Sequence, residues 1–165
     1  MNTSKLNEWL TITANLGVIA GIVFLAIEVQ QNTEIMQAQT QDSITEKQMD
    51  WYMNIGTSEF ASDLYFKGRD EGVLAFEVDS AEINAFNFIA HANPRIWENE
   101  WYQYKKQLFE DDEFLARNRI WPVLLSSPGF RAVWDSQKGI YAPDFREYLD
   151  AKLEGYLSGN SFESL

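Results

Sequence analysis

The feature that most constrains this chain is a long, uncharged, apolar stretch close to its N-terminus. It runs from Trp9 to Ile27, and the nearest charged residues on its two sides are Glu8 and Glu28. A helix of these 19 residues spans roughly 28 Å, which is close to the ~30 Å hydrocarbon thickness of a bilayer. We therefore expect residues 1–28 to form a single transmembrane helix.

Two other interpretations of this stretch stay open. A secretory signal peptide needs a basic start and a small-residue cleavage site, whereas here Lys5 and Glu8 cancel and no such site follows Ile27. A buried helix of a soluble oligomer is the other alternative, but such helices seldom lack a charge over this length. We expect the bacterial inner membrane as the location and slightly favour a cytoplasmic domain. The positive-inside rule compares the Lys and Arg residues on the two sides of a span. Here Lys5 precedes the stretch and the first cation after it is Lys47, so each side has one lysine.

Small and polar residues inside the apolar stretch predict that it associates with copies of itself. Gly17 and Gly21 form a G-x-x-x-G pair, and Ala14 lies on the same helix face. Small residues let helix backbones approach closely in lipid. Asn15 places an amide in the middle half of the span, where it is costly unless it finds a hydrogen-bonding partner. We predict an oligomerisation site at Ala14, Asn15, Gly17 and Gly21.

The same helix also permits a second interpretation, in which the oligomer encloses a polar path. Thr11 and Asn15 lie near one face, and Glu28 follows the stretch directly. A ring of acidic side chains at the mouth of a pore favours cations. A pore or ion-conducting assembly lined by Thr11, Asn15 and Glu28 is therefore the alternative function.

After the span the chain is polar and helical throughout. Residues 29–55 contain no Gly or Pro and many Gln, which predicts a polar extension of the first helix. In residues 56–158, segments with apolar residues at helical spacing are separated by Gly, Ser and Pro, and this region holds most of the aromatic residues. The pattern predicts an acidic helical domain. Residues 159–165 are expected to form a flexible tail. The predicted fold is all-α, with one long N-terminal helix followed by four to five shorter helices.

Composition limits the partners of this domain. The chain has 25 acidic and 13 basic residues, a net charge of −12, and because Lys5 and Glu8 cancel, residues 28–165 carry all of it. Such a surface is repelled by phosphates, so nucleic acid is not expected as the main partner. The chain has no cysteine, which excludes disulfides and thiolate chemistry. The expected partners are further copies of the chain, the lipid bilayer and an unidentified protein.

One helix, predicted over residues 81–108, carries the residues most suited to a polar site. They are His91, Glu98, Asn99 and Tyr102. Such a set most often fixes helix packing as a buried polar network and less often lines a ligand pocket. No nucleotide-binding or hydrolase motif accompanies it. We therefore expect no catalytic residue, no metal and no cofactor, and a membrane-tethered enzyme using this site is only the third hypothesis.

Several short motifs resemble a group of small uncharacterised bacterial proteins with one N-terminal transmembrane helix and a C-terminal helical domain. The motifs are Asn15 to Gly21 running on to Thr33, Glu98-Asn99 with Tyr102 to Tyr104, Leu125 to Gly129 with Trp134, and Pro143 to Arg146. The resemblance covers most of the chain and implies no activity. Members usually carry arginine just after the span, which implies a cytoplasmic domain, whereas those positions here are Glu28 and Glu34.

The function expected from the sequence is therefore that of an interaction protein rather than an enzyme. The chain is predicted to be a single-pass, membrane-anchored, oligomeric scaffold that presents an acidic helical domain. Self-association through the N-terminal helix distinguishes this hypothesis from a monomeric tethered enzyme.

Overall fold

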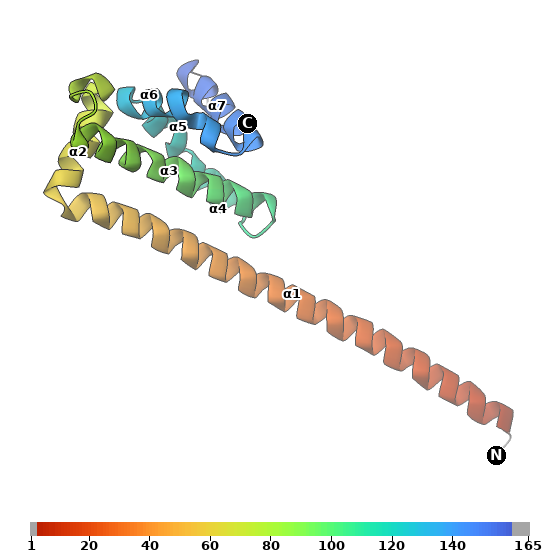
Figure 1. The fold of residues 1–165 in the computed structure, drawn as a ribbon. Coiled ribbons are helices and arrows are strands. Elements are labelled where there is room, and N and C mark those ends of the chain that lie inside the picture. The colour runs from red at the N-terminus through yellow and green to blue at the C-terminus, as the bar shows by residue number, and fades with distance from the viewer. Residues whose placement is uncertain (1–2, 160–165) are drawn as a thin grey trace. The chain divides into compact units, whose positions relative to one another are not determined.

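The computed structural model describes residues 3–159 of the chain, and within this range every regular element is a helix. The α-helices are α1 (Thr3–Thr57), α2 (Glu59–Glu71), α3 (Ala81–Lys105), α4 (Asp111–Asn118), α5 (Ile120–Leu125), α6 (Pro128–Gln137) and α7 (Pro143–Leu157), with short 3₁₀ turns η1 (Val73–Ala75) and η2 (Lys138–Ile140) (Figure 1). The all-α prediction is confirmed. The predicted tail, residues 159–165, lies outside the described residues except for Gly159.

The number of helices after α1 differs from the prediction of four to five, because residues 3–159 contain six. The additional helix arises where α4 ends at Asn118 and α5 begins at Ile120. Pro122 has no N–H to donate to the carbonyl of Asn118, so a continuous helix loses a hydrogen bond at this point. The chain therefore divides one predicted helical stretch into two short helices.

Two compact units divide the chain, residues 1–39 and residues 40–165. In the first unit α1 is a helix whose apolar side chains are exposed, including every residue from Trp9 to Ile27. Among the described residues, α1 alone is long and apolar enough to cross a membrane. The structure thus has the long apolar N-terminal helix that the sequence predicts.

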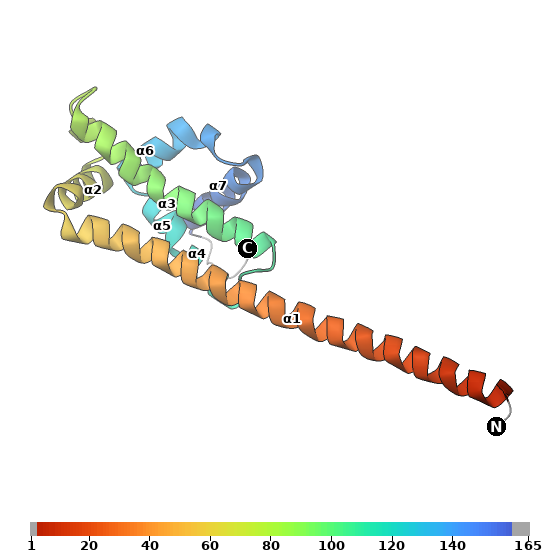
Figure 2. The same cartoon turned by 60° about the horizontal axis from the view of Figure 1, so that its bottom comes forward.

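The second unit is built around two clusters of buried side chains. The larger cluster is dominated by aromatic rings, among which Trp97 stacks on Trp121 with ring centroids 5.4 Å apart. The smaller cluster joins α2, α3 and α6 around Phe86, which is fully buried. Ile44, in the last third of α1, is 1% exposed and belongs to the larger cluster. The final turns of α1 are therefore part of this unit, and both views show them running beside α3 (Figures 1 and 2).

Helices α2 and α6 approach each other through two glycines. A Cβ atom added at Gly129 would collide with the backbone carbonyl of Gly68, and one added at Gly68 would collide with the ring of Phe86. Only hydrogen atoms fit at these positions because the obstacles are backbone and a buried ring. The two glycines thus allow the close crossing that encloses the smaller cluster.

We expect Gly129→Ala to destabilise the helical unit by about 1–3 kcal/mol, because overpacking against backbone cannot be relieved by a side-chain rotation. Urea unfolding of the full chain followed by circular dichroism measures this change. Gly139→Ala is the matched control, since a Cβ there meets nothing within 4 Å. Equal stability of the two variants would contradict the close crossing.

Candidate functional site

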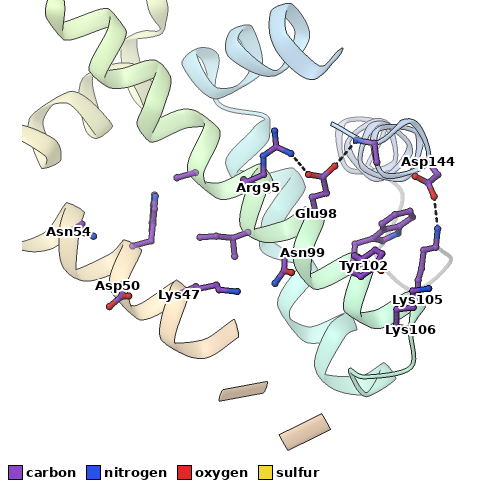
Figure 3. Close-up of a pocket in the computed structure, with 15 residues that line it drawn as sticks. Lys47, Asp50, Asn54, Arg95, Glu98, Asn99, Tyr102, Lys105, Lys106 and Asp144 are labelled. Carbon is purple, nitrogen blue, oxygen red and sulfur yellow. Dashed lines mark hydrogen bonds and ion pairs between the residues drawn. The ribbon is translucent and has the colours of Figure 1, made fainter. Parts of the chain in front are cut away.

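A long groove runs between the last turns of α1 and helix α3, and we call it the α1–α3 groove. Its volume is about 1040 Å³, and residues at the start of α7 contribute to its lining (Figure 3). The lining residues are Lys47, Asp50, Trp51, Asn54, Ala92, Arg95, Ile96, Glu98, Asn99, Trp101, Tyr102, Lys105, Lys106, Ala142 and Asp144. All of them belong to the second unit, residues 40–165.

Helical periodicity brings the residues of the α1 wall to one face. Lys47, Asp50, Trp51 and Asn54 are spaced three, four and seven residues apart, so their side chains share a side of the helix. Ile44 precedes Trp51 by seven residues, so it lies at the edge of the same face, and it is buried in the core. One side of α1 is thus fastened to the unit while the adjacent side forms a wall of the groove.

The α3 wall follows the same rule over a longer distance. Ala92, Arg95, Ile96, Asn99 and Tyr102 recur at spacings of three and four residues. This face mixes small and apolar groups with donors of hydrogen bonds. The pattern is that of a surface able to contact an amphipathic molecule.

Two ion pairs form the rim of the groove near α7. The Arg95 guanidinium lies 2.6 Å from Glu98, and the Lys105 ammonium lies 2.6 Å from Asp144. The hydrogen bond from Lys105 holds the pKa of Asp144 below its usual value. Glu98 also accepts a hydrogen bond of 2.7 Å from the backbone N–H of Ala142. These contacts tie the start of α7 to α3.

A buried ion pair joins α3 to α4 and was not predicted from the sequence. The carboxylate of Glu100 is fully buried and receives a hydrogen bond of 3.1 Å from Arg117, which also donates to Gln48 of α1 at 2.8 Å. Burial raises the pKa of Glu100, and the positive charge of Arg117 partly offsets this rise. Glu100 lies between Trp97 and Trp101 on the aromatic stripe of α3, and an acid on such a stripe was the signal available in the sequence.

The structure brings together three of the four residues proposed as a polar network. Glu98, Asn99 and Tyr102 all line the α1–α3 groove, and Tyr102 is 52% exposed. His91 lies elsewhere, with ring nitrogens 2.9 Å from the hydroxyl of Tyr141 and 2.7 Å from Oε1 of Gln137.

Tyr141, the partner of His91, has its pKa raised to about 12 by burial. Its ring also lies 4.4 Å from the guanidinium carbon of Arg95. His91 therefore contributes to a contact that joins α3 to the segment before α7, separate from the groove.

The residues predicted for the oligomerisation site are exposed on α1. A Cβ added at Gly17 or Gly21 meets nothing within 4 Å, and the side chains of Ala14 and Asn15 are exposed. The small-residue face is thus free to meet another helix.

The residues of the predicted polar path are exposed as well. Thr11 donates its hydroxyl to the carbonyl of Asn7 at 2.9 Å, and Glu28 is exposed. The Thr11 hydroxyl is satisfied within its own helix. The oligomerisation site and the polar path both stay predictions.

The described part of the chain has no group of three or more His, Asp or Glu side chains that could hold a metal ion.

Comparisons with protein-family models, with curated proteins and with solved structures find no match to this chain.

Proposed function

We propose that this protein is a single-pass, membrane-anchored, self-associating protein that holds an acidic helical interaction domain close to the membrane. The observation that carries the proposal is the exposure of every residue from Trp9 to Ile27. An uninterrupted apolar surface of this size is unstable in water and requires lipid or other helices around it.

Self-association is the second part of the proposal. Gly17 and Gly21 leave an open strip on the surface of α1, along which a second helix can approach closely. The amide of Asn15, exposed on the same helix, gains a partner when two such helices meet. Both features add something that an anchor alone does not need.

The domain's role in interaction is supported by its surface. Residues 28–165 carry the whole net charge of −12, yet they contain an open groove with a mixed wall of rings and cations. A folded unit with such a groove and with no metal cluster among its described residues is suited to binding rather than to metal chemistry.

The replacement of both Gly17 and Gly21 by leucine is expected to weaken self-association about tenfold, because bulky side chains keep the helix backbones apart. Energy transfer between labelled full-length chains in liposomes measures association. Ile19→Leu with Ile22→Leu is the matched control, since these substitutions preserve both size and apolarity. Resistance of the membrane fraction to carbonate extraction tests anchoring separately.

The two parts of the proposal can fail independently. Release of the chain by carbonate would overturn the anchor, and a strictly monomeric particle at every protein-to-lipid ratio would overturn self-association. An unchanged signal in the leucine variant would instead place the contact on another face of the helix.

A further inference from the structure

We propose that the α1–α3 groove binds a single-chain amphipathic monoanion, such as a long-chain carboxylate. The acidic head is recognised by Lys47 and Asn99, and the apolar chain lies along α3. The proposal does not depend on membrane anchoring, because every residue of the groove belongs to residues 40–165.

The shape of the groove favours an extended ligand. Its α3 wall runs from Ala92 to Lys106, a distance of about 20 Å at 1.5 Å per residue. The volume of about 1040 Å³ lies just above the range of roughly 300–1,000 Å³ for ligand pockets. A long trough between two helices suits a chain better than a compact polar metabolite.

The chemistry of the walls favours an apolar ligand body. Trp51 on α1 and Ile96 and Trp101 on α3 contribute apolar surface to the lining. The Lys105 ammonium lies 4.1 Å from the centroid of the Trp101 ring, and this contact places the charge over one face of that ring. An alkyl chain on the remaining apolar surface removes it from water without leaving polar groups unpaired.

The charges of the lining favour a negative head. Four basic and three acidic side chains line the groove, which gives it a net charge of +1 in a chain of −12. Arg95 and Lys105 are each paired with an acid of the lining. Lys47 and Lys106 form no ion pair with any described residue. One negative head balances this excess charge.

The position of the head follows from the two walls. Figure 3 shows the Lys47 side chain of α1 extending toward the Asn99 amide of α3 across the groove. An ammonium and an amide N–H that face one space are both donors, and together they suit a carboxylate. Lys106, at the far end of the α3 wall, adds to the positive potential.

Photolabelling of the full chain in phosphatidylcholine nanodiscs tests the proposal. The probe is palmitic acid with a diazirine in its chain, used at mildly alkaline pH so that its head is ionised. We expect crosslinks on peptides that contain Trp51 and Ile96. We also expect unlabelled palmitate to compete at least about tenfold better than hexadecanol, which lacks the charge.

The head contact is tested with charge variants. Lys47→Glu is expected to lower palmitate affinity about tenfold, and Lys47→Gln less, because the first reverses a charge that the second only removes. Arg119→Glu is the matched control, since Arg119 is exposed and lies outside the groove. Circular dichroism checks that each variant is folded. If Lys47→Glu does not fold, Lys47→Gln tests the head contact in its place.

Three results would overturn the proposal. Labels confined to residues 9–27 would report lipid contact by the helix alone. Equal competition by hexadecanol and palmitate would show that no anionic head is recognised. Competition by acetate as strong as that by palmitate would show that the alkyl chain of the ligand is not recognised.

Discussion

Arg117→Met is expected to destabilise the helical unit by about 3 kcal/mol, because it leaves the carboxylate of Glu100 buried without its counter-charge. Glu100 is fully buried, and the Arg117 side chain is only 16% exposed, so water cannot replace the lost partner. Urea unfolding of the full chain at neutral pH, followed by circular dichroism, measures the loss. The double variant Glu100→Gln, Arg117→Met is the control and should recover much of the stability.

The ion pair of Glu100 and Arg117 also predicts how the stability of the helical unit changes with pH. The pKa of Glu100 in the folded chain is raised above its ordinary value of 4.5. Its contribution to stability is therefore fully present below that value and is lost as pH rises through the folded pKa. Arg117→Met raises that pKa further, so its deficit should shrink as the solution is acidified. A deficit that is constant with pH would contradict burial of the charged form.

Trp121→Ala is expected to cost about 3–5 kcal/mol, because it removes a large buried ring whose site cannot collapse completely. Trp121 is 1% exposed, stacks on Trp97 and meets Phe114 edge to face with centroids 5.6 Å apart. A typical domain has only about 5–15 kcal/mol of stability in all, so the variant should unfold at much lower urea concentration.

The adjacent residue provides the control for this prediction. Ile120 is 54% exposed, so Ile120→Ala should change the urea midpoint far less. Equal losses in the two variants would mean that the aromatic cluster does not form the core.

Much of this fold was predictable because its signals are local. Apolar spacing of three and four residues and the Ser, Pro and Gly punctuation identify the helices, and an absence of charge identifies the segment from Trp9 to Ile27. The division at Arg119 was harder, since Pro122 permits either a kink or a break. Local pattern alone does not choose between them.

The site was predictable only in part, because it depends on contacts between distant segments. The sequence singled out Glu98, Asn99 and Tyr102, which share one helix and one groove. The sequence did not identify Lys47 as a residue of the groove, since the pattern of a polar helix does not indicate which other helix it packs against. Nor did it pair Glu100 with Arg117, because seventeen residues and a change of helix separate them.

The crossing of α2 and α6 has a consequence for recognising relatives of this chain. A side chain at Gly129 would meet the backbone of Gly68, and one at Gly68 would meet the ring of Phe86, so neither substitution can be absorbed by a change at the other glycine. Descent should therefore preserve the two glycines together, while the surrounding surface diverges freely. A pair of glycines kept at these two helices is a signature by which distant members of the lineage can be found.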